Sequence, residues 1–587
     1  MSKPDVKLQA VLRSACPPSE EQRSRLTAFL EKKYQQSVEL TWSEDKSILG
    51  GFRIELGTEV IDWTTGGRLD QLKEKLASIS AGSQDVIPLI RDTVKSWVPE
   101  VLAYEVGSVL RVADGIAYVS GLEHASYGEI LLFEGGIRGM VQDLKEDRIG
   151  CILFGDYEAV RAGDAVRRTG KTAGIGAGDA YLGRVVDALG APIDGKGPIA
   201  ADAYRPIENP APGIIDRQPV DKPMETGILS IDSMFPIGRG QRELIIGDRQ
   251  TGKTAIAVDT ILNQKGKNVV CIYVAIGQKA SSVAQLTEML RAAGALEYTT
   301  VVCASASDFA SMQYIAPYAG CALGEYFMEK GRDVLIVYDD LSKHAIAYRA
   351  LSLLLERSPG REAYPGDVFY LHSRLLERSA HLSDERGGGS MTALPIVETL
   401  DGDVSAYIPT NIISITDGQI YLESSLFFAG QRPAVNVGLS VSRVGGAAQT
   451  KAMKKAVGTL RLDLAQYREM EVFTQFSSDL DDDTKQQLVY GQSLMRLLRQ
   501  NRGRPYSSAE QVVLLVTALG HIQQQLPVDR IGTFNAKLLG DFASSQAALM
   551  QELESTAVLT DDSRKRILDQ AKRSLAAFQS AEAGNGR

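Results

Sequence analysis

The stretch Gly247-Asp-Arg-Gln-Thr-Gly-Lys-Thr254 matches the phosphate-binding loop G-x-x-x-x-G-K-[ST] at every fixed position. Residues 243–246 before it form a short apolar run typical of a buried strand, and residues 255–262 after it carry apolar side chains at helical spacing. The motif therefore has the strand and the helix that it requires on either side. The pattern predicts an α/β domain that binds a nucleoside triphosphate.

Each residue type in this loop has a reason to be there. Backbone N–H groups at the start of a helix point at phosphate oxygens, a lysine adds positive charge near the β and γ oxygens, and a hydroxyl can bind Mg²⁺. We therefore expect Thr254 to be a metal ligand as well as part of the loop. The predicted phosphate contacts are Gly247, Asp248, Arg249, Gln250, Thr251, Gly252, Lys253 and Thr254.

A second apolar run, residues 333–338, ends in Asp339 and Asp340. Taken alone, an acidic pair after a strand is also common in solvated turns. Behind a matched phosphate loop it is typical of the Walker B strand, whose carboxylate holds Mg²⁺ directly or through water. Asp339 is therefore the predicted partner of Thr254 at the metal.

Hydrolysis needs one more group, which orients or deprotonates the attacking water. The strand after the loop helix ends near Gln278. An amide can hydrogen-bond a water but cannot accept its proton at neutral pH. Either this site does not hydrolyse its nucleotide, or the base lies elsewhere and Gln278 is incidental.

The glycine-rich segment 440–446 contains one arginine, Arg443, at the end of the α/β region. An arginine there could complete a neighbouring subunit's nucleotide site in trans, an effect worth roughly 10³ to 10⁵ in rate where such residues have been tested. The alternative is an ordinary surface arginine in a loop.

Length and charge limit the classes of protein to consider. A chain of 587 residues is too long for one core, and its net charge of −9 argues against a protein that acts on nucleic acid, although a local basic groove stays compatible. The five cysteines show no C-x-x-C spacing and are expected to be reduced core residues: Cys16, Cys151, Cys271, Cys303 and Cys321. The N-terminus has no apolar signal, and no run of about 18 apolar residues occurs, so we expect neither secretion nor a membrane span.

Composition and periodicity change along the chain and predict several domains. The predicted units are a small α+β domain (1–80), a linker and tether helix (81–103), a β-barrel (104–170), an α/β domain (171–446), a helical bundle (447–575) and a flexible tail (576–587). Predicted strands of the α/β domain lie at 269–275, 300–304, 333–338 and 368–371, and predicted helices of the bundle at 451–476, 483–499 and 508–525.

Several long motifs together resemble the alpha subunit of F-type ATP synthases, over about residues 104–555. They are 247–254, 338–343 (Tyr-Asp-Asp-Leu-Ser-Lys), 359–374 (Pro-Gly-Arg-Glu-Ala-Tyr-Pro-Gly-Asp and onward), 413–418 and 440–446. The resemblance implies a β-barrel crown, a RecA-like P-loop domain and a helical C-terminal domain. It also implies an alternating ring with beta subunits around a gamma central stalk.

The resemblance further implies roles for single residues. Alpha subunits carry a glutamine like Gln278 where the catalytic beta subunit carries a glutamate, so Mg-ATP would be held here without turnover. Arg443 resembles the arginine that alpha presents to the beta catalytic site, and Ser440 resembles a position required for activity, where it would hold that segment in place. Positions that resemble the adenine pocket are Arg432, Pro433 and Gln500. One departure is Arg502, where many alpha chains have a second glutamine.

Residues 1–80 do not resemble an alpha subunit. The segments Leu49-Gly-Gly-Phe52, Val60-Ile-Asp62 and Gly67-Arg-Leu69 are similar to the C-terminal half of the delta (oligomycin-sensitivity) subunit. That resemblance implies contact with the b subunits of the peripheral stalk. A coincidental small α+β extension is the alternative.

The combined prediction is a non-catalytic, regulatory alpha subunit of a rotary ATP synthase with a fused delta-like domain. It would be peripheral to the cytoplasmic face of a bacterial inner membrane, in a complex that makes ATP from an ion gradient. One rival is a self-sufficient hydrolytic ring ATPase of the secretion or helicase type. Another is a scaffold whose nucleotide site is silent.

Overall fold

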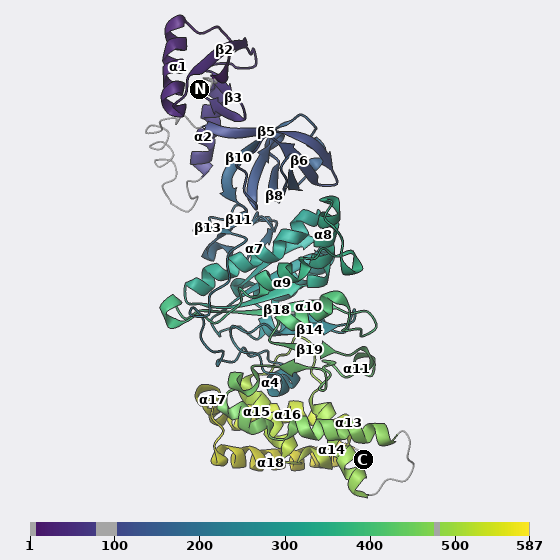
Figure 1. Ribbon diagram of the computed structural model, residues 1–587. Helices are drawn as coiled ribbons and strands as arrows, with labels where there is room; N and C mark the ends of the chain where they lie inside the picture. The colour runs from purple at the N-terminus through teal and green to yellow at the C-terminus, as the bar shows by residue number, and fades with distance from the viewer. Residues whose placement is uncertain (1–6, 78–102, 475–481, 586–587) are drawn as a thin grey trace.

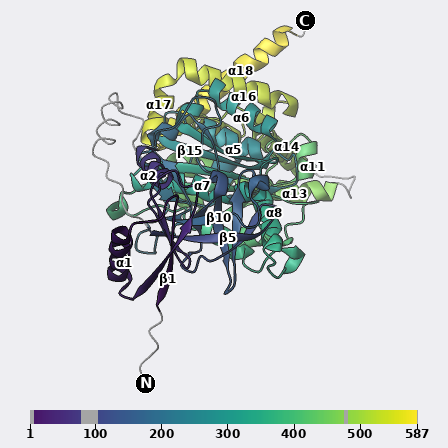
Figure 2. The ribbon, with the colours of Figure 1, turned by 90° about the horizontal axis from the view of Figure 1, so that it is seen from above.

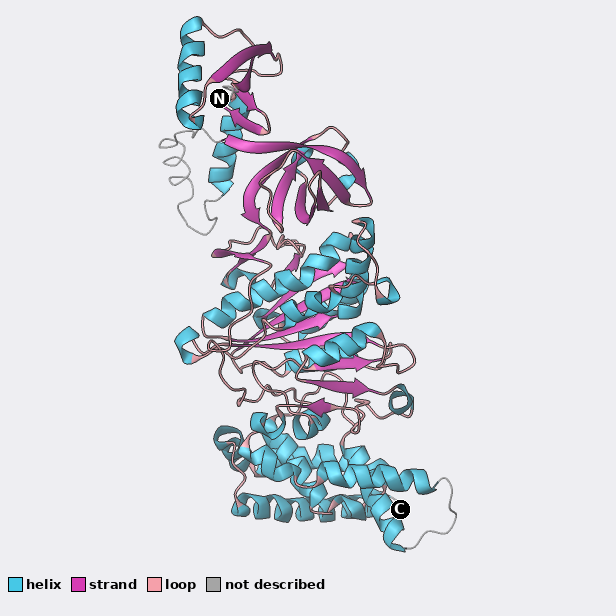
Figure 3. Cartoon of the chain, viewed as in Figure 1, coloured by secondary structure: helices cyan, strands magenta, loops and turns pink. Residues whose placement is uncertain are grey.

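The computed structural model describes residues 7–77, 103–474 and 482–585. Figure 1 shows four units stacked along the chain: a small N-terminal unit, a barrel, a central sheet with helices on both faces, and a helical unit at the opposite end. Figure 3 shows strands in the first three units and helices in the last. The predicted fold class is confirmed. The predicted tether helix lies outside the described residues.

The N-terminal unit is a four-stranded sheet, in the order β2-β1-β3-β4, with helix α1 packed on it. Its elements are β1 (Leu8–Ser14), α1 (Glu20–Tyr34), β2 (Val38–Glu44), β3 (Arg53–Leu56), β4 (Glu59–Asp62) and α2 (Thr65–Ala77). Helix α1 begins at Ser19, whose hydroxyl accepts the backbone N–H of Gln22 at 3.2 Å, while the Gln22 side chain accepts the backbone N–H of Ser19. In this capping box, each of the two side chains satisfies a backbone N–H group at the helix start.

Six antiparallel strands close into a barrel in the order β10-β7-β8-β9-β6-β5, with β10 pairing back to β5. They are β5 (Ala103–Ala113), β6 (Ile116–Ser120), β7 (Glu129–Phe133), β8 (Arg138–Leu144), β9 (Ile149–Phe154) and β10 (Ala165–Thr172). Strand β4 of the N-terminal unit pairs antiparallel with the start of β5, with Val60 opposite Tyr104. The two units therefore share one continuous ten-stranded sheet.

The central sheet has eight strands in the order β12-β16-β15-β17-β18-β14-β19-β20, and only the β19–β20 pair is antiparallel. The strands are β12 (Val185–Asp187), β14 (Leu244–Gly247), β15 (Val269–Gln278), β16 (Thr299–Ser305), β17 (Asp333–Asp339), β18 (Ser390–Glu398), β19 (Gly418–Leu422) and β20 (Val441–Ser442). A separate pair, β11 (Gly174–Ala177) and β13 (Ala203–Pro206), lies between barrel and sheet.

Alternate residues of β15 enter two different cores, because successive strand side chains point to opposite faces. Cys271 and Tyr273 pack with α5 (Lys253–Leu262) and α6 (Ala280–Ala292). Ile272 and its neighbours pack on the other face. The helices of that face are α7 (Ala310–Glu329), α8 (Leu341–Leu354), α9 (Val368–Leu376) and α10 (Tyr407–Ile415).

The core of the α5 face continues into the C-terminal helical unit, so these two units share one apolar interior. Figure 2, the view from above, shows the C-terminal helices at the rim of the molecule and α18 extending beyond it. The helices are α12 (Lys451–Val457), α13 (Leu460–Thr474), α14 (Asp482–Leu497), α15 (Ser508–Leu519), α16 (Ile531–Ser545), α17 (Ala547–Thr556) and α18 (Asp561–Asn585). Among the described residues, no helix is both long and apolar enough to cross a membrane.

Four predicted elements need correction. The helix predicted at 508–525 ends at Leu519. Residues 368–371 are the first turn of helix α9, not a strand, because Val368, Leu371 and Leu375 are buried at helical spacing while Tyr370 is exposed. The single helix predicted at 451–476 is two helices, interrupted at Gly458, which has φ +47°. The tail expected from residue 576 is helical, because α18 continues to Asn585.

Candidate nucleotide site and interface arginine

The phosphate loop connects the buried strand β14 to helix α5, as its sequence motif requires. Two of its glycines are dictated by geometry. A Cβ on Gly247 would lie 2.5 Å from the carbonyl oxygen of Leu422, and Gly252 has a φ of +100° at the start of α5. Only glycine meets both conditions without strain, so the loop keeps its backbone N–H groups at the helix start.

Lys253 is buried and its ammonium group lies against the loop. Its Nζ donates to the carbonyl oxygens of Gly247 at 2.9 Å and of Asp248 at 2.6 Å. Burial lowers the pKa of Lys253, whereas the carboxylates of Glu398 and Asp340 raise it. Since an ammonium group has three donors, one remains for a further acceptor such as a phosphate oxygen.

The two predicted metal ligands lie next to each other. The hydroxyl of Thr254 donates to Asp339 Oδ2 at 2.7 Å, and the phenol of Tyr273 donates to the same oxygen at 2.5 Å. Burial and the Asp339 charge raise the pKa of Tyr273 well above its ordinary value, so the phenol remains a donor. Asp339 is thus the shared acceptor for strand β15 and helix α5.

Gln278 ends strand β15, and its amide nitrogen donates two hydrogen bonds. Its Nε2 donates to the carbonyl oxygen of Asp339 at 2.9 Å and contacts the phenol oxygen of Tyr273 at 3.2 Å. The side chain therefore ties the end of β15 to the end of β17. At this position the chain presents amide donors and no carboxylate.

Among the other predicted loop residues, Asp248 is held by hydrogen bonds, whereas Arg249 and Gln250 are exposed. Asp248 accepts hydrogen bonds from Ser424 at 2.6 Å and Thr399 at 2.7 Å, which holds two neighbouring loops to the phosphate loop. Arg249 is exposed and pairs with Glu398 at 3.1 Å, and Gln250 is exposed at the tip.

Asp340 caps helix α8 by accepting the backbone N–H of Lys343 at 2.7 Å, and it pairs with the Lys343 ammonium at 2.9 Å. Burial raises the pKa of Asp340 to about 6, while Lys343 lowers it. The two acids after β17 therefore have different surroundings. Asp339 faces Thr254, whereas Asp340 belongs to the helix.

The geometry fits Mg²⁺ with a nucleoside triphosphate. A hydroxyl and a carboxylate meet at Thr254 and Asp339, a helix start faces outward, and a lysine lies beside it. When bound, Mg²⁺ would neutralise phosphate charge. Lys253 would contact phosphate oxygens, while Thr254 and Asp339 would hold the ion.

The predicted adenine residues meet one another beside the loop. The guanidinium of Arg432 lies 4.4 Å from the ring centre of Phe427, and that ring reaches within 3.9 Å of the position of a Cβ on Gly252. The backbone N–H of Gln500 donates to the carbonyl oxygen of Arg432 at 2.9 Å. Pro433 follows Arg432 in the same loop.

The Gln500 amide has partners within the protein. It accepts the backbone N–H of Leu229 at 3.0 Å and donates to the carbonyl oxygens of Gly227 at 2.7 Å and Arg504 at 2.9 Å. It therefore joins the 500–504 loop to the start of α4 (Leu229–Met234). Arg502, in the same loop, is exposed.

Arg443 lies at the opposite end of the strands from the phosphate loop. It follows Ser442, which pairs with Gly418 at the start of β19, whereas Gly247 pairs with Leu422 at the end of β19. Four residues of strand separate these ends, roughly 13 Å. Arg443 is exposed, and its guanidinium makes no hydrogen bond or ion pair with any other described residue.

Ser440 is fully buried and belongs to the backbone of this segment. Its hydroxyl accepts the N–H of Tyr421 at 3.0 Å, and its own N–H donates to the carbonyl oxygen of Asn436 at 3.1 Å. These bonds hold the turn that leads into β20. Ser440 can thus position Arg443 without contacting a nucleotide.

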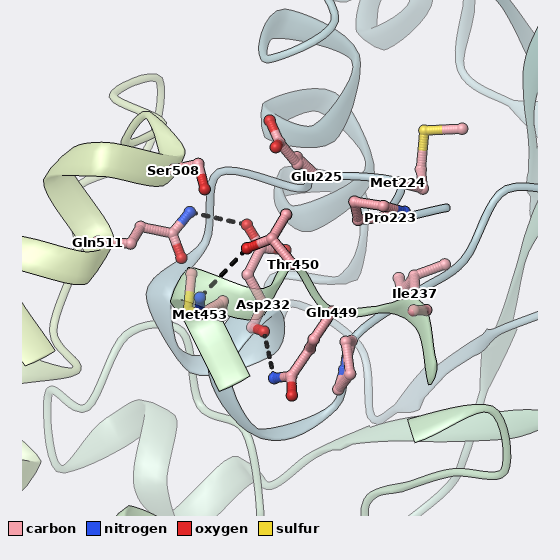
Figure 4. A pocket seen from close by; sticks show the side chains of 12 residues that line it. Pro223, Met224, Glu225, Asp232, Ile237, Gln449, Thr450, Met453, Ser508 and Gln511 are labelled. Carbon is pink, nitrogen blue, oxygen red and sulfur yellow. Dashed lines mark hydrogen bonds between the residues drawn. The ribbon is translucent and has the colours of Figure 1, made fainter. Parts of the chain in front are cut away.

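A small cavity of about 20 Å³ lies elsewhere, where the central sheet meets the C-terminal helices. Figure 4 shows Gln511 and Gln449 converging on Asp232 there. Gln511 donates to the buried carboxylate of Asp232 at 2.7 Å, and Gln449 donates to its carbonyl oxygen at 3.1 Å. This volume holds about one water, so the cavity is part of a domain junction.

Sequence reasoning missed Tyr273, Phe427 and Glu243 near these sites. Tyr273 lies inside the strand that precedes Gln278, where its spacing resembles any core position. Phe427 is one of two adjacent phenylalanines in a short helix, α11 (Ser424–Phe428). The only sequence signal for Tyr273 was a polar hydroxyl in an apolar strand.

Comparison with known proteins places each unit. Residues 104–170 match the beta-barrel domain of the ATP synthase alpha/beta family, residues 227–442 its nucleotide-binding domain, and residues 449–574 the C-terminal domain of its alpha/beta chains. Residues 2–76 match the ATP synthase delta (OSCP) subunit.

Two similar proteins of known name are both alpha subunits of ATP synthase. The chain is 58% identical over 484 residues to ATP synthase subunit alpha of Caldanaerobacter subterraneus subsp. tengcongensis, covering 82% of this chain and 96% of the relative. It is 58% identical over 485 residues to the subunit alpha of Acetivibrio thermocellus, with the same coverage. The chain therefore belongs to the ATP synthase alpha/beta family, as an F-type alpha subunit with a delta (OSCP)-type domain in front of the barrel.

Proposed function

We propose that this chain holds Mg-ATP without hydrolysing it, as the non-catalytic and regulatory alpha subunit of a rotary ATP synthase. The observation that carries the proposal is Gln278. Its amide donates to Tyr273 and to the Asp339 carbonyl oxygen at the strand end, where hydrolysis would need a proton acceptor. Neither an amide nor a phenol with a raised pKa can accept a proton from water at neutral pH.

Binding would rest on the phosphate loop. Lys253 would contact the β and γ oxygens, the loop N–H groups would bind the remaining phosphate oxygens, and Thr254 with Asp339 would hold Mg²⁺. Arg432 stacked on Phe427 offers a flat, cationic surface for the adenine. Because the Gln500 amide already has three protein partners, its contribution to the base pocket would be to position Arg432 through the backbone.

Arg443 would act on a neighbouring beta subunit. Arg443 lies at the end of the strands away from the phosphate loop of its own chain. It therefore cannot reach the nucleotide site of its own chain without unpairing β20. An exposed guanidinium without protein partners is available to stabilise charge on a transferring phosphoryl group in a neighbour. Ser440 would hold the segment that presents it.

Membership of the family supports a proposal for the assembly. We infer that the chain alternates with beta subunits in an alpha3-beta3 ring around a gamma stalk, and that residues 1–80 contact the b subunits of the peripheral stalk. It would be a peripheral protein on the cytoplasmic face of a bacterial inner membrane. The complex would use a transmembrane ion gradient to make ATP from ADP and phosphate.

Nucleotide binding and turnover by the purified chain test the proposal. We expect the chain to bind Mg-ATP and to show no steady hydrolysis, and we expect Lys253→Gln to weaken binding about a hundredfold while Arg291→Gln, on the exposed face of α6, leaves it nearly unchanged. Steady hydrolysis that survives Gln278→Ala would instead indicate a self-sufficient ring ATPase. Failure to bind Mg-ATP at millimolar concentration would indicate a scaffold.

A further inference from the structure

Glu243 and Arg443 lie in one small region, and each has side-chain polar atoms without a hydrogen-bond partner among the described residues. Glu243 is fully buried, and its Oε1 has no hydrogen-bond partner among the described residues. Its other oxygen accepts only the side-chain N–H of Gln241, at 2.7 Å. Leaving a buried carboxylate oxygen unsatisfied is costly. The exposed guanidinium of Arg443 makes no hydrogen bond within the described chain.

The sheet register brings these groups together. Glu243 immediately precedes β14, and its carboxylate extends over Gly418 at the start of β19: a Cβ on Gly418 would lie 2.6 Å from Oε2. Gly418 pairs with Ser442 of β20, the residue before Arg443. Gln241 links Glu243 to β20, because its Nε2 also donates to Ser442 Oγ at 3.1 Å. The missing side chain at Gly418 thus leaves room for a carboxylate between β14 and the Arg443 segment.

The surrounding charges define the electrostatics of this carboxyl. Burial raises the pKa of Glu243 well above its ordinary value, the nearby Asp417 carboxylate raises it further, and the Gln241 hydrogen bond and the Arg443 charge lower it. Arg242 is committed elsewhere, to Asp417 at 2.8 Å and to Glu377. Among the residues that the structure describes, Arg443 is therefore the cation that remains for Glu243.

We propose that Glu243 is a positioning residue for Arg443, and that its free carboxylate oxygen, when ionised, receives the Arg443 guanidinium in competition with the neighbouring subunit. The side chain then has two positions, one docked on its own subunit and one extended, as in the structure. On extension the buried carboxyl takes up a proton, and on docking it releases that proton. An effect of Glu243 on catalysis by the assembled ring rests on the proposed donation of Arg443 to a beta subunit. The docking of Arg443 on Glu243 does not.

Arginine-selective labelling of the purified chain tests the docking. Phenylglyoxal would be applied near neutral pH and at about pH 8.5, and peptide mass spectrometry would give the labelling rate of Arg443 relative to exposed Arg502. In the wild type we expect a lower ratio at the higher pH, because ionisation of Glu243 favours docking of the guanidinium. Glu243→Gln should raise the ratio about fivefold at the higher pH and remove its pH dependence. Glu288→Gln, an exposed change on α6, should leave it unchanged.

A ratio that stays the same in Glu243→Gln and at both pH values would overturn the docking. Because Glu243 is buried, circular dichroism and Mg-ATP binding must first show that the variant is folded, and Glu243→Asp, which keeps the acid, should retain the pH dependence. In the assembled ring, Glu243→Gln should change kcat and its pH profile more than KM. If labelling responds as expected while Arg443→Ala leaves ring turnover intact, the proposed donation fails and the docking stands.

Discussion

At the scale of single residues, two buried histidines on helices α8 and α9 of the nucleotide domain have the clearest consequence for stability. His344 Nδ1 lies 3.2 Å from His372 Nε2, and His344 Nε2 lies 3.0 Å from the carbonyl oxygen of Tyr314. Burial lowers the pKa of His344 to about 4 and that of His372 well below its ordinary value. Both imidazoles are therefore neutral in the folded chain at neutral pH.

This pair predicts a loss of stability in weak acid. Unfolded histidines take up a proton near pH 6.5 and the folded pair does not, so the free energy of unfolding falls as pH drops from about 6.5 towards 4, by about 3 kcal/mol for His344. His372→Gln should flatten this decline, measured as the calorimetric melting temperature between about pH 7 and pH 4.5. Substituting exposed His521 in the same way is the control. An equal decline in both variants would show that the pair does not titrate on unfolding.

The phosphate loop, Thr254 and Asp339 could be predicted because a short local pattern defines them. Tyr273, Phe427 and Glu243 could not, because each reaches its site only through the strand order of the central sheet. The sequence also cannot show that the Gln500 amide is occupied by backbone partners from residues 227–229. Those contacts span more than two hundred positions in the chain.

At the scale of secondary-structure elements, the pairing of β4 with β5 joins the N-terminal unit to the barrel. Thr58 accepts the Val106 N–H at 2.8 Å, and the buried carboxylate of Asp62 accepts the phenol of Tyr104 at 3.1 Å. Glu59 and Glu105 face each other directly across the pair. Glu59 pairs with Lys33 at 3.4 Å, and Glu105 pairs with Arg168 at 3.1 Å. These ion pairs offset the repulsion between the two carboxylates.

A disulfide can test this junction. Because Thr58 and Val106 form a hydrogen-bonded pair, Glu59 and Glu105 form a close, non-hydrogen-bonded one, about 4.5 Å between Cα atoms. In a Cys16→Ser background, Glu59→Cys with Glu105→Cys should oxidise almost completely to an internal crosslink, visible on a non-reducing gel. The pair Glu39→Cys with Glu105→Cys, with one cysteine on the far edge strand β2, should not. Equal crosslinking, or none in the first pair, would contradict the shared sheet.

Elements with strong patterns could be predicted, and those with mixed patterns could not. Helix α1 has a capping box and β15 a long apolar run. Strand β1 has no such pattern, because its buried face, which includes Ala10 and Ser14, is small and partly polar. Residues 368–371 were interpreted as a strand because a run of four apolar side chains does not distinguish a strand from a helix turn until their burial is known.

At the scale of the whole molecule, the N-terminal unit and the C-terminal helices lie at opposite ends, with barrel and nucleotide domain between them (Figure 1). The N-terminal unit has a small core of its own, distinct from the two cores of the central sheet. A contact made by this unit is therefore separated in space from nucleotide chemistry. The domain order could be predicted from composition, but the continuous sheet between the first two units could not.

Deleting residues 1–80 should separate the two roles. We expect the assembled ring to hydrolyse ATP at a rate near that of the complete chain, because the central sheet and its loops are unchanged. We also expect poor docking on the peripheral stalk, measured as loss of b subunits on gel filtration and loss of ATP synthesis in membrane vesicles. Normal ATP synthesis and normal retention of b subunits after the deletion would show that residues 1–80 do not provide the stalk contact.

The central claim is that this chain holds nucleotide and acts on catalysis only through a neighbour. Arg443→Ala in a reconstituted ring with beta subunits tests it most directly, with Arg443→Lys as the variant that keeps the charge but loses the planar fork. We predict normal assembly, normal Mg-ATP retention at Lys253 and Thr254, and a fall in ring ATP turnover of about a thousandfold or more. Unimpaired turnover by the Arg443→Ala ring would contradict the account.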